Sequence, residues 1–364
     1  MKVSNKRWFR VLSIVLVFSM VFALAACGAK APPKASDPQT SEPVKVSENS
    51  KGYKIGWSNI YMTPSWMQQV GEYIDARIEH WKAEGVVSEY TLANANGDTA
   101  TQIAQIENMI SQGYDAIVLI AGSATALNAV VDKCKAEGVV VVNFDSLVTT
   151  DSVTCTINND NKEYAEICAE WMGKTLGGKG KVVTFTGPAG IASAEERAQY
   201  AEDYLAKNYP DIKVVSRLNA EYNEAPSYDV ISPVLDANPD LAGIVALGGS
   251  QASGALKACI EKKMIIPISS ENYNAFLRKW DELKPQGFSS IALAHPCWLG
   301  ALAVDQCVRI LNGEPYDKEI IIPIPLITDD NLSDFVPNEY PDDYFPLAKF
   351  TDDMITEYLT PKSK

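Results

Sequence analysis

The chain has 364 residues, of which 46% are hydrophobic and 21% are charged. This length predicts about two soluble domains, since a domain usually takes about 150 residues. The formal net charge is −14. An acidic surface repels nucleic-acid phosphates and anionic lipid, which argues against a nucleic-acid-binding role.

The first 26 residues differ from the rest of the chain. Residues 1–10 contain Lys2, Lys6, Arg7 and Arg10 and no acidic residue, and residues 11–26 are apolar except for two serines. A basic start followed by a short apolar run predicts a secretory signal peptide, and the run is short for a permanent membrane span. The remaining chain has 28 basic and 46 acidic residues, a formal charge of −18.

The signal peptide ends in Leu24-Ala25-Ala26-Cys27, which resembles the bacterial lipoprotein box. The resemblance implies that Cys27 is lipid-modified and anchors an extracytoplasmic protein to the bacterial cell membrane. The alternative is an ordinary signal peptide that is cut elsewhere. Residues 27–51 are rich in Pro, Ser, Lys, Ala and Glu without a hydrophobic period, and this predicts a disordered tether.

The folded part is expected to begin near residue 52, with a strand over 54–58, a helix over 66–84 and a strand over 90–95. Asp98 is the expected N-cap of a helix over 98–112. The next stretch contains the clearest unit: apolar runs at 116–120 and 139–143, joined by helical spacing over 124–137. Strands that are apolar throughout and joined by a helix indicate a parallel sheet covered on both faces.

The same alternation continues to the end of the chain. The further expected strands are 154–157, 181–186, 212–216, 242–247, 265–269 and 290–294. The further expected helices are 161–176, 194–208, 227–238, 250–262, 274–283, 298–311 and 352–359. Residues 319–327 are expected to form a strand pair or a crossover, and Pro233 requires a kink or a helix start.

Two such series predict an α/β fold of two doubly wound parallel-sheet lobes, with a hinge and an interlobe cleft. The N-terminal lobe is expected to contain residues 52–157 and 293–322. The C-terminal lobe is expected to contain residues 158–292 and 323–360.

Six cysteines besides Cys27 are spread thinly over a long chain, which does not indicate a disulfide framework. Most fall in apolar runs, so they are expected to be small buried hydrophobic residues, with one disulfide as the open alternative. These residues are Cys134, Cys155, Cys168, Cys259, Cys297 and Cys307.

Residues 54–330 resemble the periplasmic sugar-binding proteins of the ribose/galactose type, which are the type I binding proteins of ABC importers. The resemblance is carried, in the family's order, by SNxxxTPSWxxxV, NxDTATQIAQIENMISQGYDAIVL, GVVVVNFDS, INNDN and GxxGxxSAEERAQY. It implies a monomeric lipoprotein without a cofactor that captures a small polar ligand, a sugar, and delivers it to an ABC permease.

The resemblance also implies ligand contacts in the first lobe. Trp66 would stack on a sugar ring, with Asn59 and Tyr61 nearby; the alternative is that Trp66 is a core residue. Asp145 would accept hydrogen bonds from two hydroxyls, or it is a turn or N-cap residue. The arginine that follows this aspartate in the family is replaced by Ser146, and Ser123 follows the neighbouring strand.

In the second lobe, Arg197 matches an arginine that points into the cleft, although an exposed helix position is the alternative. Tyr222 matches an aromatic residue. An Asn-Asp pair of the family falls on Gly248-Gly249, so its polar groups are missing unless Ser250 or Gln251 replaces them. Glu271 matches an aspartate. His295 lies near the position of a glutamine and is expected to line the cleft rather than act as a base, and Trp298 is a third aromatic candidate.

Other classes of protein fit the sequence less well. An enzyme is not expected, because His80 and His295 are the only histidines and neither a Cys-x-x-Cys nor a Gly-x-Ser-x-Gly motif occurs. A transcription regulator with this fold needs an N-terminal DNA-binding segment, where this chain has a signal peptide. A receptor lipoprotein that presents its closed form to a signalling partner remains the alternative to uptake.

Overall fold

The computed structural model describes residues 51–63, 65–189, 191–336, 339–347 and 350–362, all within one compact unit of residues 40–364. The predicted signal peptide (1–26), the lipidation site Cys27 and the predicted tether up to residue 50 lie outside the described residues. No helix in the described ranges is both long enough and apolar enough to span a membrane.

The first lobe is built on a six-stranded sheet of order β11-β5-β4-β3-β1-β2, in which all neighbours are parallel. Its strands are β1 (Tyr53–Asn59), β2 (Val87–Asn94), β3 (Ala116–Leu119), β4 (Val140–Phe144), β5 (Cys155–Asn158) and β11 (Glu319–Ile321). Its helices are α1 (Ser65–Ala83), α2 (Thr99–Ser111), α3 (Asn128–Ala136) and α9 (Leu299–Leu311).

Strand β3 shows why its apolar run is continuous. Ala116 and Val118 pack into the core under α1 and α9, whereas Ile117 and Leu119 pack into the core under α2 and α3. Both faces of the strand are therefore buried, as the sequence predicts for a parallel sheet with helices on both sides.

The second lobe is built on a six-stranded sheet of order β12-β10-β9-β8-β6-β7. Its strands are β6 (Lys179–Thr186), β7 (Asp211–Asn219), β8 (Leu241–Val245), β9 (Ile268–Glu271), β10 (Ser290–Leu293) and β12 (Leu326–Ile327). Its helices are α4 (Asn161–Thr175), α5 (Ala192–Asn208), α6 (Glu224–Ala237), α7 (Gly249–Glu261) and α8 (Asn274–Leu283), with short 3₁₀ helices at Lys284–Gln286 and Leu332–Asp334.

This second sheet is not wholly parallel, because β12 pairs with β10 in the antiparallel direction. The chain reaches β12 directly from the first lobe, without the crossover helix that a parallel neighbour within one sheet requires. The expected strand pair or crossover at 319–327 is therefore a crossover: β11 belongs to the first sheet and β12 to the second.

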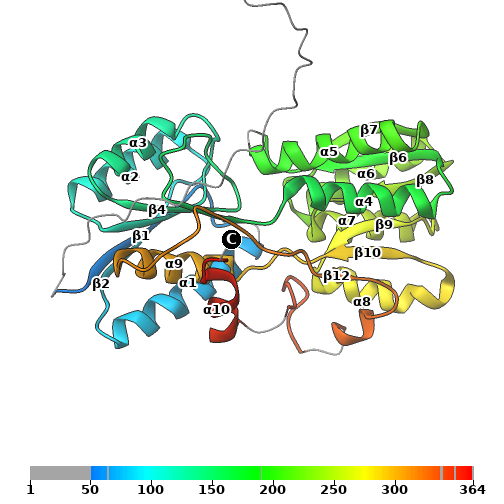
Figure 1. The fold of residues 1–364 in the computed structure, drawn as a ribbon. Coiled ribbons are helices and arrows are strands. Elements are labelled where there is room, and N and C mark those ends of the chain that lie inside the picture. The colour runs from blue at the N-terminus through cyan, green and yellow to red at the C-terminus, as the bar shows by residue number, and fades with distance from the viewer. Residues whose placement is uncertain (1–50, 64, 190, 337–338, 348–349, 363–364) are drawn as a thin grey trace, which may run out of the picture. The chain divides into compact units, whose positions relative to one another are not determined.

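In the described part of the chain, the strands pass between the two sheets three times: after β5, after β10 and after β11 (Figure 1). Hydrogen bonds tie these passages together. The side-chain amide of Asn159 donates to the carbonyl oxygens of Ile322 (2.7 Å) and Pro323 (3.3 Å), and the backbone N–H of Ala294 donates to the carbonyl of Pro325 (2.9 Å). Three adjacent short connections are typical of a hinge.

The C-terminal tail departs from the predicted lobe boundary. Helix α10 (Asp352–Leu359) lies against α9 in the first lobe (Figure 1), although residues 323–360 are assigned to the second lobe from the sequence. Stacking on Trp298 holds the helix in this place. The indole ring of Trp298 stacks on Phe350 (5.9 Å between ring centroids) and on Tyr358 (5.7 Å).

Two further expectations concern Pro233 and the cysteines. Pro233 lies inside α6, which begins at Glu224 with Asn223 as its N-cap, so the proline is tolerated within a helix rather than starting one. All six cysteines in the described ranges are free and buried, so the alternative of a disulfide among them does not hold.

Candidate functional site

A cavity lies between the two lobes at the carboxyl ends of their strands. Its lining consists of Tyr61, Trp66, Met67, Asp145, Ile191, Ser193, Arg197, Tyr222, Ser250, Glu271, His295 and Phe345. Parallel sheets bring their strand ends to one edge, and this is where α/β proteins bind ligands. About 50 Å³ of free space remains between these side chains, so a bound molecule would replace several of the contacts described below.

Arg197, in the first half of α5, makes several polar contacts in the cavity. Its guanidinium donates to Asn161 Oδ1 (2.8 Å) and lies 3.5 Å from Glu271 Oε1 and 3.2 Å from His295 Nδ1. It also lies over the ring of Tyr164, 4.3 Å from the ring centroid. The arginine is therefore buried inside the lobe interface and is not an exposed helix residue.

Glu271, at the end of β9, is buried beside this arginine. Its second carboxylate oxygen accepts a hydrogen bond from the backbone N–H of Gly249, at the first residue of α7 (3.1 Å). Burial raises the pKa of the Glu271 carboxyl, whereas His295 and Arg197 lower it. The carboxylate thus receives an N–H donor from a helix N-terminus, which favours negative charge.

His295 connects the two lobes. It follows β10 in a passage between the sheets, and its Nε2 lies 3.2 Å from Asp145 Oδ1 of the first lobe. Its backbone carbonyl accepts a hydrogen bond from Trp66 Nε1 (3.0 Å), and its ring lies 4.7 Å from the Trp66 ring, centroid to centroid. Trp66 is therefore a buried core residue that also lines the cavity, so its place in the core does not exclude stacking on a ligand.

Tyr222 rests on two glycines. A Cβ atom at Gly187 would lie 2.2 Å from the Tyr222 ring, and one at Gly248 would lie 2.6 Å from it. Tyr222 itself has a φ of +49°, which is rare for a residue with a side chain and typical of functional sites. Gly248 thus leaves room for the Tyr222 ring, in addition to lacking the polar group that the family has at this position.

Eight of the eleven ligand-binding residues expected from the sequence line the cavity: Tyr61, Trp66, Asp145, Arg197, Tyr222, Ser250, Glu271 and His295. The other three, Asn59, Ser123 and Ser146, are not in its lining. Asn59 donates to the carbonyl of Tyr61 (2.7 Å), and Ser123 Oγ accepts from the backbone N–H of Ala126 (3.2 Å), so both serve their own loops. Ser146 is buried in the loop that follows β4, where its backbone carbonyl accepts a hydrogen bond from the side-chain amide of Asn143 (2.9 Å).

The lining also contains residues that the sequence does not single out. Met67 lies beside Trp66 in α1, Ser193 lies in α5 with Arg197, and Ile191 is the N-cap residue of α5, so these three follow from the placement of α1 and α5. Phe345 lies in the tail, beyond the region of resemblance, and no local signal marks it. Gln251 does not reach the cavity: its side-chain amide donates to the carbonyl of Thr186 (2.8 Å).

The described residues contain no group of three or more His, Cys, Asp or Glu side chains that is arranged to hold a metal ion. The lining of the cavity offers four aromatic rings, two carboxylates, one guanidinium and one imidazole. Such a set suits a small polar molecule that is held by hydrogen bonds and ring packing.

Comparison with known proteins identifies the family of this chain. The family model of the periplasmic binding protein domain matches residues 55–315. The chain is 25% identical over 320 residues to the ribose import binding protein of Bacillus subtilis (strain 168), and the matched region covers 88% of this chain and 99% of that protein. It is 25% identical over 289 residues to the xylitol-binding protein of Mycolicibacterium smegmatis, which covers 79% of this chain and 80% of that protein.

The fold matches a solved structure, the solute binding protein of an ABC transporter from Thermobispora bispora DSM 43833, with a TM-score of 0.74 and 23% identity. That match covers 84% of this chain and 94% of the other. The family model spans well over half of the chain and places it among binding proteins rather than enzymes. The chain therefore belongs to the periplasmic binding protein family and has that family's type I fold.

Proposed function

We propose that this protein captures a sugar or a sugar-derived polyol between its two lobes and delivers it to an ABC importer. The observation that carries the proposal is the cavity itself, in which Trp66 and Tyr222 supply ring faces and Asp145 and Glu271 supply charged acceptors. Sugars present C–H faces that pack on aromatic rings and hydroxyls that donate strongly to carboxylates. The relatives named for ribose import and for xylitol support this ligand class.

The eight expected residues that line the cavity are the proposed ligand contacts. The ligand would shift an equilibrium between separated and approached lobes, because it contacts both at once. Asp145 approaches it from the first lobe, Arg197 from the second and His295 from the passage between them.

Isothermal titration calorimetry with D-ribose and xylitol, followed by other pentoses, hexoses and inositols, tests the proposal. A ligand present at a hundredfold excess over its Kd stabilises the folded state by about 2.7 kcal/mol, so thermal unfolding gives a second measurement. We expect at least one compound to bind and to raise the melting temperature by several degrees. Absence of binding across the whole panel would contradict sugar capture.

The extracytoplasmic protein is further proposed to be a monomeric lipoprotein, with residues 1–26 as its signal peptide and Cys27 as its lipidated residue. The support is the match of Leu24-Ala25-Ala26-Cys27 to the lipoprotein box. Fractionation of cells tests it: the wild-type protein should sediment with membranes, and the Cys27→Ala variant should not. Equal membrane association of both would argue against the lipid anchor.

A further inference from the structure

The C-terminal segment 339–347 lies beyond the matched family region, yet it contacts the second lobe closely. The side-chain amide of Asn274 donates to the carbonyls of Tyr340 (3.0 Å) and Pro341 (2.9 Å). The side-chain amide of Asn272 donates to the carbonyl of Pro346 (3.0 Å). These buried asparagines hold the segment against the start of α8.

The same segment is bonded to the first lobe through one residue, Gln69 of α1. The backbone N–H of Phe345 donates to Gln69 Oε1 (2.9 Å), and Gln69 Nε2 donates to the carbonyl of Phe345 (3.1 Å). Both polar groups of the glutamine side chain are thus used on one residue, and Gln69 is only 5% exposed. Such a two-way bond fixes the position and direction of the Phe345 backbone.

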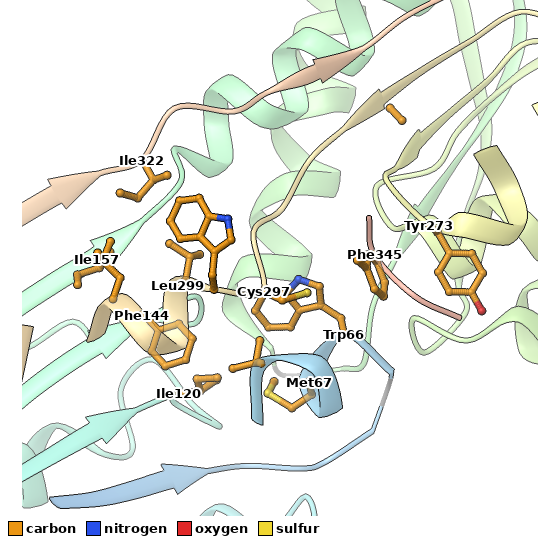
Figure 2. Close-up of a cluster of buried hydrophobic side chains, with 14 of the residues drawn as sticks. Trp66, Met67, Ile120, Phe144, Ile157, Tyr273, Cys297, Leu299, Ile322 and Phe345 are labelled. Atoms are coloured by element: carbon orange, nitrogen blue, oxygen red, sulfur yellow. The ribbon is translucent and has the colours of Figure 1, made fainter. Parts of the chain in front are cut away.

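The ring of Phe345 points into the interlobe region. It is 2% exposed, lines the cavity, and meets the ring of Tyr273 edge to face with 5.4 Å between centroids. Figure 2 shows it between Trp66 of the first lobe and Tyr273 of the second. It belongs to the hydrophobic cluster that continues from one lobe to the other.

We propose that Phe345 is a specificity-determining residue of the ligand cavity and that Gln69 is the positioning residue that holds it there. This inference rests on the proposed function and names the size class of the ligand. The phenyl ring closes the side of the cavity next to Trp66, so the site accepts a single sugar or polyol unit and excludes a disaccharide. Close packing makes the ring's volume unavailable to any ligand atom.

Replacement of the ring tests the proposal by calorimetry, with D-ribose, xylitol, myo-inositol and the disaccharide sucrose as probes. Phe345→Ala should weaken binding of the preferred small probe at least tenfold and move the ratio of sucrose to small-probe affinity at least tenfold toward sucrose. Phe345→Leu keeps an apolar side chain and so disturbs folding less than alanine does. It should change the small-probe affinity and the affinity ratio in the same directions as Phe345→Ala, but by less. Gln69→Met should weaken small-probe binding while keeping the ring in the chain.

Phe350→Ala is the matched control. Phe350 lies in the same tail as Phe345, but it stacks on Trp298 and does not line the cavity. It should change the affinity ratio less than twofold. An unchanged ratio in both Phe345 variants would overturn the proposal.

A measurement on the ligand-free protein separates this proposal from the proposed function. Acrylamide quenching of tryptophan fluorescence should increase in Phe345→Ala, because the change uncovers Trp66, and this increase should vanish when Trp66→Phe is added. Phe350→Ala uncovers Trp298 instead, on which Phe350 stacks, so any increase in that variant should remain when Trp66→Phe is added. If no probe binds the wild-type protein, sugar capture fails, and quenching alone then decides whether Phe345 forms the wall: equal quenching in the wild-type protein and in Phe345→Ala would show that it does not.

Discussion

The guanidinium of Arg197 lies 3.5 Å from the carboxylate of Glu271, and both side chains are almost fully buried in the second lobe. Neither residue is accessible enough for solvent to compensate the loss of the other. The two residues both line the cavity, and the effect of each on the free energy of unfolding should depend on the other.

Removal of one partner should be costly. Arg197→Met leaves the Glu271 carboxylate buried without its cation, and the free energy of unfolding should fall by about 3–5 kcal/mol. Arg197→Met combined with Glu271→Gln should cost less than the sum of the single changes, because no unpaired charge remains. Urea unfolding of the four proteins measures the coupling, and strictly additive costs would contradict it.

The carboxylate of Asp145 should account for a large part of ligand affinity. Asp145→Asn removes the charge but keeps the size, and asparagine tolerates the φ of +58° at this position. A hydrogen bond to a charged group contributes about 1.5–3 kcal/mol, so Kd should rise roughly 10- to 100-fold. Calorimetry with the best-bound sugar measures this.

Asp151→Asn is the control for this change, because Asp151 is exposed and lies outside the cavity lining. It should bind the same sugar as tightly as the wild-type protein. Equal affinity in the Asp145 variant would remove Asp145 from the ligand contacts.

Gly248 should be intolerant of a methyl group, because a Cβ atom there would lie 2.6 Å from the ring of Tyr222. Gly248 has an extended φ of −148°, so the effect is a contact with the ring and not backbone strain. Gly248→Ala should displace Tyr222 and weaken sugar binding about tenfold or more. In a Tyr222→Ala background the closest contact of the new Cβ atom is with Gln251 Oε1 (3.0 Å), so the same change should cost clearly less stability than in the wild-type protein; an equal cost would point to another cause.

Asp305 should make stability depend on pH. It accepts hydrogen bonds from Arg77 Nε (2.5 and 2.7 Å) and Trp81 Nε1 (2.7 Å), which joins α9 to α1. Burial raises its pKa from 3.8 to about 6, against the lowering effect of Arg77. Because the folded-state pKa is raised, this contribution to stability is complete below about pH 4 and is lost as the pH rises through about 6.

Asp305→Asn removes the titrating group. The stability of the wild-type protein relative to this variant should therefore fall by roughly 2 kcal/mol between pH 4 and pH 7, which is most of the ~3 kcal/mol that a shift of about two pKa units is worth. Urea unfolding across this range measures the difference. Asp352→Asn, which changes only the exposed carboxylate 3.5 Å from Arg77, is the control and should follow the wild-type profile.

Much of the fold is predictable from local pattern. The apolar runs of β3 and β4 and the helix between them are read from the sequence because each strand is buried on both faces. Helix α3 begins at Asn128 rather than at residue 124, since the preceding residues form a turn in which Ser123 caps the N–H of Ala126. A hydrophobic period does not report such a turn.

The part of the site that lies at the ends of strands can be predicted from the sequence. Asp145, Tyr222 and Glu271 follow or end strands of parallel sheets, and such ends meet at one edge. Asn59 ends β1 and Ser123 follows β3, yet their polar atoms bond to their own loops. Which way a loop residue points is decided by those local bonds, and strand order alone does not reveal it.

By itself, the sequence determined two doubly wound lobes, their order of strands and helices, and most of the polar groups at the strand ends, because periodicity and burial are local properties. Only the tertiary structure decided that α10 packs on the first lobe, that β12 is antiparallel, and that Phe345 enters the cavity. Gln69 and Phe345 are 276 positions apart, and their contact leaves no periodic trace in the chain. Contacts of this kind depend on how the whole molecule packs, and the sequence around either residue does not contain that information.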